Sequence, residues 1–253
     1  MHLGMVTYQV AKDWDLDTMI DMCLKTGFEG VELRTTHAHG VEIALGAEER
    51  ATAKAKFRDS GIVLWGLGTA CEYHSPDPDE VRRNIEETKQ FVVLARDTGA
   101  VGVKVRPNGF AEDAGVSKAQ TLEQIGKALR ECGEYAEDYG VELWVEVHGP
   151  GTSHPPYIKT IMDVCDHPLV GTCWNCNQGD IVDCSIEQYI RPLMPKIRQC
   201  HIHDLYEDYP YSELIRVLRD AKFDGFCNIE MPESAEPERL LKYYAMLWKA
   251  WTA

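Results

Sequence analysis

The sequence contains no run of about 18 uncharged apolar residues, the length that an α-helix needs to cross a bilayer. Its first residues also lack the basic segment followed by an apolar segment that marks a secretory signal peptide. From these two absences we expect a cytoplasmic protein that makes no membrane contact.

Basic residues are in the minority. The chain has 26 Lys and Arg residues against 41 Asp and Glu residues, which gives a formal net charge of -15. A field of that sign repels phosphodiester backbones and anionic membrane surfaces. We therefore expect no nucleic-acid partner.

Two common site motifs are absent or incomplete. No G-x-G-x-x-G opens a helix after the first expected strand, which disfavours dinucleotide binding. The nine cysteines are widely spread, so we expect reduced thiols rather than a disulfide framework. Cys173 and Cys176 have C-x-x-C spacing, but no second such pair follows, which disfavours a structural zinc or redox site.

Short β-rich apolar segments alternate with longer segments of helical period, and no Pro- or Ser-rich linker interrupts them. We expect strands near 3–8, 29–34, 62–68, 101–106, 141–147, 169–175, 197–203 and 226–230. We expect helices near 15–26, 47–60, 78–98, 117–139, 156–166, 185–193, 211–221 and 236–250. Eight βα units in one domain over residues 1–253 predict a single (β/α)8 TIM barrel, with a doubly wound open sheet as the alternative.

Side-chain alternation divides several expected strands into an apolar face and a polar face. In a barrel one face packs against the helices and the other points into the lumen, so the polar face must point inward. The inward set is predicted to include Glu32, Arg34, Lys104, Arg106, Glu142, Trp144, Glu146, His148, His201, His203, Asn228 and Glu230. Buried charge without a partner is costly, so a lumen of this kind indicates a site.

Two carboxylates and one imidazole fall at the ends of three expected strands. Glu146, His201 and Glu230 form a set of oxygen and nitrogen donors that suits one divalent ion: Mn²⁺, Co²⁺, Mg²⁺ or Zn²⁺. Because they are far apart in the chain, only the fold can bring them together. The alternative is that each is a lumen residue in an internal salt bridge.

Motifs along nearly the whole chain resemble those of the xylose isomerase-like TIM barrels. This superfamily of sugar-phosphate isomerases and epimerases also includes inosose dehydratase, hydroxypyruvate isomerase and endonuclease IV. The segments that carry the resemblance are LGMVTYQ, GFEGVELR, CEYHSPDPDEVRR, VEVHGPG, CHIHD and NIEMPE.

The resemblance implies a single metal held by Glu, Asp, His and Glu from the last four strands. The matching positions here are Glu146, Asn175, His201 and Glu230. Asn175 departs from the family pattern, and an amide carbonyl ligates a hard cation without contributing charge. Either Asn175 serves as a neutral ligand, with Asp180 as a more distant substitute, or this barrel has lost its metal.

The resemblance also implies the chemistry. A bound metal would polarise a carbonyl, and Glu146 and Glu230, as the catalytic pair, would remove and return a proton through an enediolate-like intermediate. Isomerisation, epimerisation and β-elimination can all follow from that step.

Several neighbouring residues are candidates for substrate binding. His148 follows Glu146 on the same strand face, which favours contact with a substrate hydroxyl. Lys104 and Arg106 can bind a carboxylate or an oxyanion, although an internal ion pair with Glu32 or Glu142 is the alternative.

Three further candidates follow the third and seventh strands. His203 stands where the family's H-x-K-D motif has Lys, and Asp204 matches the motif's Asp, which would orient a neighbouring histidine. His74 lies in the loop after the third strand, where a substrate contact is one interpretation and a solvent-exposed loop residue is the other.

The leading prediction is a metal-dependent isomerase or epimerase that acts on a small-molecule ketose or keto-sugar. The alternatives are a metal-dependent dehydratase or lyase on a keto-polyol and a non-catalytic sugar-binding barrel. An abasic-site endonuclease is disfavoured by the net charge of -15. The family resemblance also allows a homo-oligomer.

Overall fold

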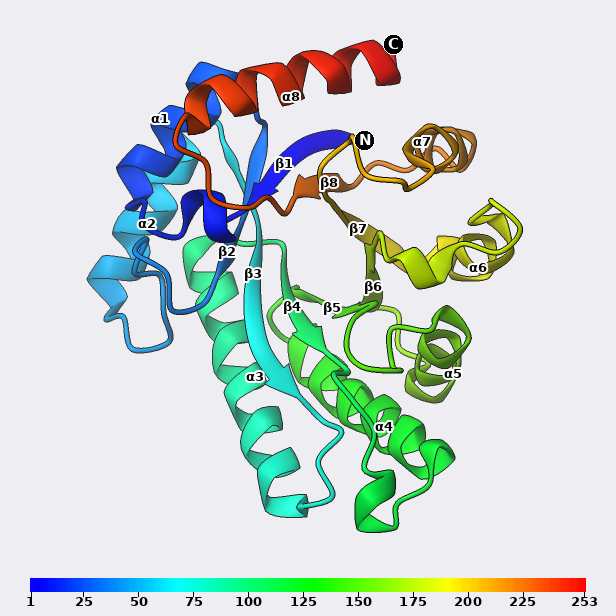
Figure 1. Cartoon of the computed structure of the whole chain (residues 1–253). Helices are drawn as coiled ribbons and strands as arrows, with labels where there is room; N and C mark the ends of the chain where they lie inside the picture. Colours follow the sequence, from blue (N-terminus) through cyan, green and yellow to red (C-terminus); the bar gives the residue numbers. More distant parts are fainter.

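The computed structural model describes all 253 residues and is a closed barrel of eight parallel strands surrounded by helices (Figure 1). Each strand pairs with the next along the chain, and β1 closes the barrel against β8. The predicted (β/α)8 TIM barrel is therefore confirmed, and the open-sheet alternative is wrong.

Every expected strand and helix has a counterpart within a few residues. The strands are β1 His2–Val6, β2 Gly30–Arg34, β3 Val63–Glu72, β4 Gly102–Arg106, β5 Glu142–Glu146, β6 Val170–Asn175, β7 Ile197–Ile202 and β8 Phe226–Ile229. The helices are α1 Leu16–Thr26, α2 Ala47–Ser60, α3 Pro78–Thr98, α4 Lys118–Glu137, α5 Pro155–Cys165, α6 Glu187–Leu193, α7 Tyr211–Asp220 and α8 Pro237–Thr252. None of these helices has the length and apolar character needed to cross a membrane.

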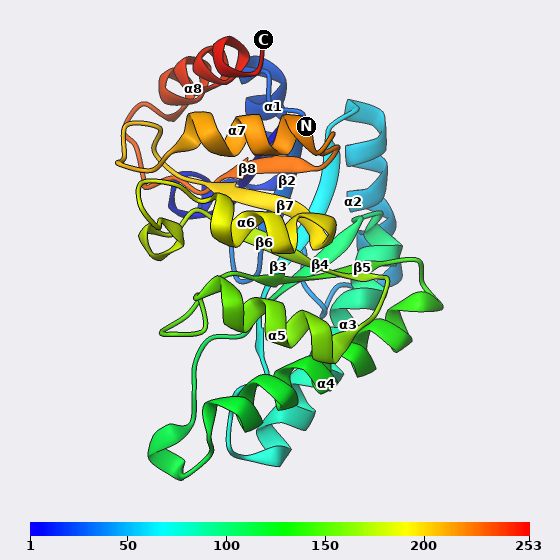
Figure 2. The ribbon, with the colours of Figure 1, turned by 90° about the vertical axis from the view of Figure 1, so that its right-hand side faces the viewer.

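Local chemistry explains where the helices begin and end. The Asp15 carboxylate accepts a hydrogen bond from the Thr18 amide at 2.8 Å and so begins α1. α1 ends at Gly27, whose φ of 85° is a left-handed conformation that glycine adopts at little cost. Helices of this kind cover the outside of the barrel, as the side view shows (Figure 2).

The main hydrophobic core lies between the outer faces of the strands and the surrounding helices. A single cluster of 63 buried residues fills it. Val31 and Leu33 of β2 and Val103 and Val105 of β4 belong to this cluster, as the predicted alternation requires. The polar residues between them consequently face the lumen.

Aromatic side chains fill the lumen toward its N-terminal end. The Trp65 ring lies 5.3 Å from the Trp144 ring and 4.8 Å from the Phe226 ring, measured between centroids. Glycines on the neighbouring strands make room for them, because a Cβ atom on Gly102 would lie 2.4 Å from the Trp144 ring. This packing closes the lower end, so the polar part of the lumen opens only at the C-terminal mouth.

We expect Gly102→Ala to destabilise the barrel by about 1–3 kcal/mol, because the added methyl group forces the Trp144 ring out of its packed position. Gly179→Ala is a matched control, since a Cβ atom there meets no atom within 4 Å. Urea unfolding of both variants measures the free energy of unfolding. Equal stability of the two variants would contradict a tightly packed aromatic floor.

Candidate metal centre and active site

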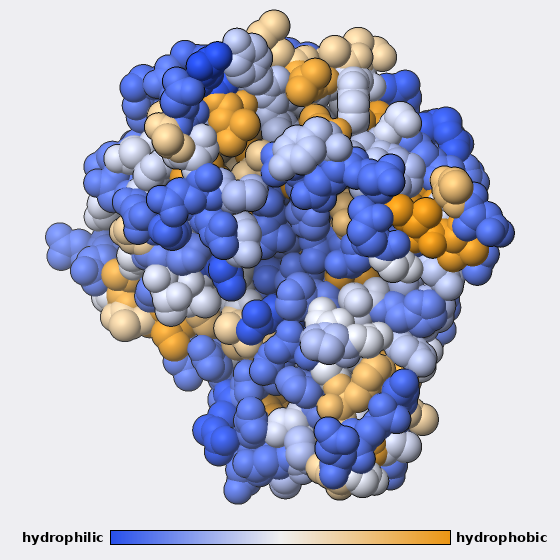
Figure 3. All heavy atoms as spheres, in the orientation of Figure 1, coloured by the Kyte–Doolittle hydropathy of each residue, from blue (hydrophilic) through white to orange (hydrophobic).

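A polar cavity of about 400 Å³ lies at the C-terminal mouth of the barrel. Figure 3 shows this face hollowed near its centre, with hydrophilic atoms around the hollow. The lining residues are Tyr8, Arg34, Lys104, Arg106, Glu146, His148, Asn175, Asn177, His203, Asp204, Glu207, Glu230 and Pro232. Most of the residues predicted from sequence therefore meet in one place.

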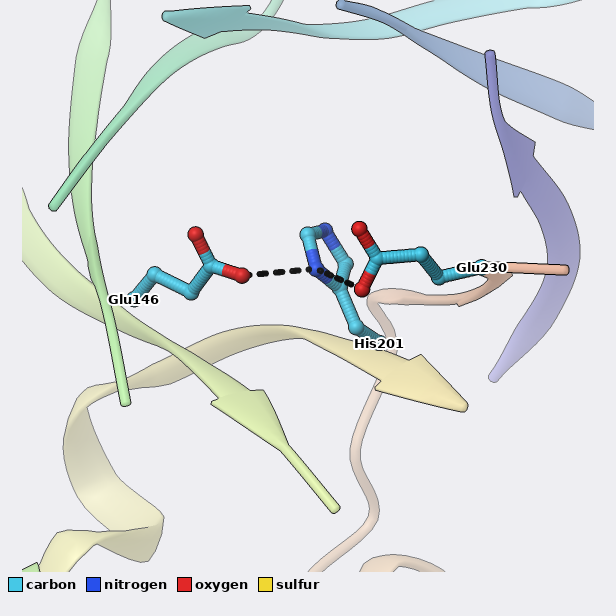
Figure 4. A group of neighbouring side chains, drawn as sticks. All are labelled: Glu146, His201 and Glu230. Atoms are coloured by element: carbon cyan, nitrogen blue, oxygen red, sulfur yellow. Dashed lines mark ion pairs between the residues drawn. The ribbon is translucent and has the colours of Figure 1, made fainter. Parts of the chain in front are cut away.

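Glu146 and Glu230 line this cavity, and the buried His201 lies next to both of them. Each offers one ligand atom, and these atoms lie within 4.8 Å of one another. His201 Nδ1 is 3.3 Å from Glu146 Oε1 and 3.7 Å from Glu230 Oε2. Figure 4 shows the two carboxylates approaching the imidazole ring from opposite sides.

The geometry of this set fits a cation. His201 Nδ1 is buried and has no hydrogen-bond partner, although it faces two carboxylates. Burial works against a charged imidazole, but Cys173, Glu32 and Glu146 nevertheless raise the pKa of His201 well above its usual value. Positive charge is therefore favoured at this position, and Glu146, His201 and Glu230 would supply it with oxygen and nitrogen ligands.

Glu32 orients the imidazole ring from below. This residue is fully buried, and its Oε2 atom accepts a hydrogen bond from His201 Nε2 at 3.1 Å. Gln199 donates to the same oxygen and accepts from Asn228 at 2.9 Å. Because the Glu32 carboxylate can only accept, Nε2 carries a proton, and Nδ1 is the nitrogen on which a metal would replace a proton, an arrangement common behind metal-binding histidines.

Asn175 lies beside His201 in the register of β6 and β7. Its Oδ1 atom is 3.1 Å from His203 Nε2, and the residue is buried at the edge of the cavity. Asp180 does not line the cavity: it is fully buried and accepts a hydrogen bond from the Asn177 amide at 2.9 Å. Burial raises the pKa of Asp180 to about 7, so this side chain is not a ready substitute for Asn175.

Lys104 and Arg106 have partners other than those expected. Lys104 Nζ donates to Glu146 Oε2 at 2.7 Å, and both residues are buried. Arg106 lies 3.7 Å from Glu72, so the expected internal pairs with Glu32 or Glu142 are wrong. Glu142 instead accepts a hydrogen bond from the Trp144 indole, because Glu142 is the first residue of β5 and so lies at the end of the strand away from the mouth.

The remaining predicted site residues differ in where they lie. His148 lines the cavity with a buried Nδ1 atom that has no partner, and burial lowers the pKa of this histidine. His203 also lines the cavity and lies 3.7 Å from Glu230. Asp204 is at the rim, where burial raises the pKa of its carboxyl group, and it forms no ion pair with a histidine. His74 lies outside the cavity, packed next to Gly109.

Two residues of the site have no catalytic or ligand-binding role predicted from the sequence. Glu32 and Arg34 belong to the GFEGVELR segment, and strand parity predicts that both face inward, with Glu32 only as an alternative ion-pair partner of Lys104 or Arg106. The partners of Glu32 are Gln199 and His201, which belong to a strand far along the chain, so spacing alone could not reveal them. Trp65 and Trp144 pack in the lumen floor, whereas Tyr8 lines the cavity.

A larger hollow, of about 670 Å³, lies between α1 and α8 on the outer surface. Its residues include Met22, Tyr243 and Met246, and Figure 3 shows apolar atoms over α8 at the top of the view. It contains no group of histidines and carboxylates that converge on one point. The smaller cavity at the barrel mouth is therefore the candidate active site.

We expect Glu32→Gln to weaken divalent-metal binding about 10- to 100-fold, because the amide no longer holds the His201 imidazole in one tautomer. Mn²⁺ affinity, measured by isothermal titration calorimetry, tests this. Glu29→Gln is the control, since Glu29 is half-exposed and contacts His2 near the opposite end of the barrel. Unchanged affinity in Glu32→Gln would remove Glu32 from the site.

We expect Asn175→Asp to tighten metal binding, because a carboxylate adds one negative charge to the donor set beside His201. The same titration measures the affinity, and elemental analysis of the purified protein measures the bound metal. Glu146→Ala is the comparison that should lose the metal. An affinity equal to that of the unchanged protein would mean that residue 175 is not a ligand.

Known structures share this fold over nearly the whole chain. A D-psicose 3-epimerase crystallised in the presence of D-fructose has a TM-score of 0.83 at 15% identity, covering 100% of this chain and 99% of that one. The 3-keto-D-glucoside 4-epimerase YcjR from E. coli has a TM-score of 0.80 at 13% identity, and the match covers 98% of each chain. The IOLI protein with a bound zinc atom has a TM-score of 0.74 at 18% identity, and the match covers 100% of this chain and 96% of that one.

Identities this low establish a shared fold and leave the activity open. A search of curated proteins finds no match. A sequence model of the family described as xylose isomerase-like TIM barrel matches residues 20–247, which is most of the chain. The protein therefore belongs to the xylose isomerase-like TIM barrel family.

Proposed function

We propose that this protein is a divalent-metal-dependent isomerase or epimerase that moves a proton next to the carbonyl of a ketose or keto-sugar. The observation that carries the proposal is the pair of carboxylates, Glu146 and Glu230, that face one imidazole at the mouth of the barrel. The similarity to two sugar epimerase structures supports the same substrate class.

In this proposal Glu146, Asn175, His201 and Glu230 would hold the metal. The bound ion would polarise the substrate carbonyl and lower the pKa of the carbon-bound proton beside it. The orphaned Nδ1 atom of His201 and the two carboxylates around it support this ligand set.

Both carboxylates are in the charged form that can accept a proton. Burial tends to raise the pKa of Glu146, but Lys104 and His201 outweigh it and hold that pKa well below its usual value. Burial likewise opposes the lowered pKa of Glu230, which His203 and His201 maintain. One carboxylate on each side of the bound carbon allows removal on one face and return on the other.

The two glutamates differ in how firmly they are held. The Glu146 side chain is 3% exposed and hydrogen-bonded to Lys104, whereas the Glu230 side chain is 19% exposed and lies 3.7 Å from His203. The Glu230 carboxylate is therefore freer than that of Glu146 to adjust its position when it accepts and returns a proton. His203 and His148 line the cavity beside the carboxylates and can hydrogen-bond to substrate hydroxyls.

We expect Glu230→Gln to reduce turnover at least about 100-fold while leaving the fold intact, because an amide cannot accept the proton. The assay is deuterium uptake from heavy water into a panel of ketoses and keto-polyols, read by NMR. Loss of water from a keto-polyol in the same assay would identify the elimination chemistry instead.

Glu233→Gln is the control for this experiment, since Glu233 lies in the same segment, is 68% exposed and pairs with Lys12. Full turnover in Glu230→Gln would contradict the two-carboxylate mechanism. Sugar binding without any metal uptake or deuterium exchange would indicate a non-catalytic barrel.

A further inference from the structure

Charge is divided across the cavity. The cations Arg34, Lys104 and Arg106 come from β2 and β4. The acids Glu146, Asp204, Glu207 and Glu230 come from β5 and from the segments that follow β7 and β8. A substrate bound at the candidate metal ligands can therefore extend toward the cationic residues of the same cavity.

Arg34 is the one arginine of the 13 in this chain whose guanidinium forms neither a hydrogen bond nor an ion pair. It lies over the Tyr8 ring, 5.4 Å from the centroid, and both residues line the cavity. An arginine fork presents five N–H donors, and those of Arg34 are free to bind an anionic group that enters the cavity.

The Arg34 backbone is held firmly on both sides. Its amide donates to Thr7 Oγ1 at 2.7 Å, and its carbonyl accepts from His39 Nε2 at 2.7 Å. The other nitrogen of His39 accepts from the Val41 amide at 3.0 Å, which fixes the imidazole tautomer. The main chain is thus fixed, while the guanidinium has no hydrogen-bond or ion-pair partner and contacts only the Tyr8 ring.

Arg106 provides a second set of donors to the same cavity. Its Nε atom is buried without a partner, and its closest carboxylate, Glu72, is 3.7 Å away. Glu72 is already bound by the Asn108 side chain. Lys104 differs from both arginines, because its ammonium group is committed to Glu146 at 2.7 Å.

We propose that the substrate is a sugar acid, a keto-sugar that carries a carboxylate, and that Arg34 with Arg106 binds this carboxylate on the β2–β4 side of the cavity. This rests on the proposed function, which places the reacting carbons at Glu146 and Glu230. Three cationic and four acidic side chains line the cavity, so a divalent ion leaves one positive charge in excess. A carboxylate balances that charge, whereas a phosphate dianion exceeds it.

The position of the acids also disfavours a phosphate. In many barrels of this fold a phosphate binds at the loops after the seventh and eighth strands. Here those segments place Asp204, Glu207 and Glu230 on the cavity. The anion-binding donors lie instead on the opposite side of the mouth, on strands β2 and β4.

The test compares D-fructuronate with D-fructose, which differ only in having a carboxylate or a hydroxymethyl group at one end, and with D-fructose 6-phosphate. Binding to the full-length protein with Mn²⁺ is measured by isothermal titration calorimetry. We expect D-fructuronate to bind about 10- to 100-fold more tightly than D-fructose, because each hydrogen bond to a charged group is worth that order of affinity.

Arg34→Met should abolish most of this preference, measured as the ratio of the D-fructuronate and D-fructose affinities, and Arg34→Lys should retain part of it. Arg239→Met on α8, which removes an exposed arginine paired with Glu236, is the control and should retain the full preference. Thermal melting of each variant establishes that the barrel is folded.

Three results would overturn the inference: no detectable binding of D-fructuronate, equal affinity for the acid and the neutral sugar, or tighter binding of the phosphate. Deuterium uptake is measured separately. Uptake without an Arg34-dependent preference would refute the carboxylate site and leave the proposed function standing. An Arg34-dependent preference without uptake on any substrate would refute the proposed function and leave the carboxylate site standing.

Discussion

The buried His201 imidazole is the centre on which the rest of the site depends. It is 1% exposed and has Glu32 on one nitrogen and Glu146 and Glu230 near the other, with Lys104 bound to Glu146. Charges removed from water in this way are stable only when each has a well-placed partner. These charged residues come from five different strands or strand ends, and only the closed barrel brings them together.

The aromatic packing at the N-terminal end of the lumen determines that the polar network opens to solvent at the C-terminal end. Trp65, Trp144 and Phe226 fill the space below it, and glycines on β1 to β4 allow these rings to pack inside the barrel. Polar side chains above the rings can reach water only through the mouth. The same packing therefore explains why the cavity is at the C-terminal end and why its deepest residues are so strongly buried.

The two departures from the family pattern contact each other. Asn175 stands where the family has Asp, His203 stands where it has Lys, and the two side chains are 3.1 Å apart. Exchanging an acid and a cation for two groups without permanent charge leaves the net charge of this corner unchanged. In the proposed ligand set, the charge lost at position 175 is thus matched by the charge lost at position 203.

The sequence by itself determined the strand and helix order and the inward faces, because side-chain alternation has a period of two and the helical segments have their own period. It also placed Glu146, His201 and Glu230 at strand ends. Only the tertiary structure decided that Glu32, 169 residues from His201, contacts it, that Lys104 binds Glu146, and that Asp180 is packed away from the cavity. Those pairings depend on strand tilt and register in a closed barrel, which bring together inward side chains that no local sequence pattern connects.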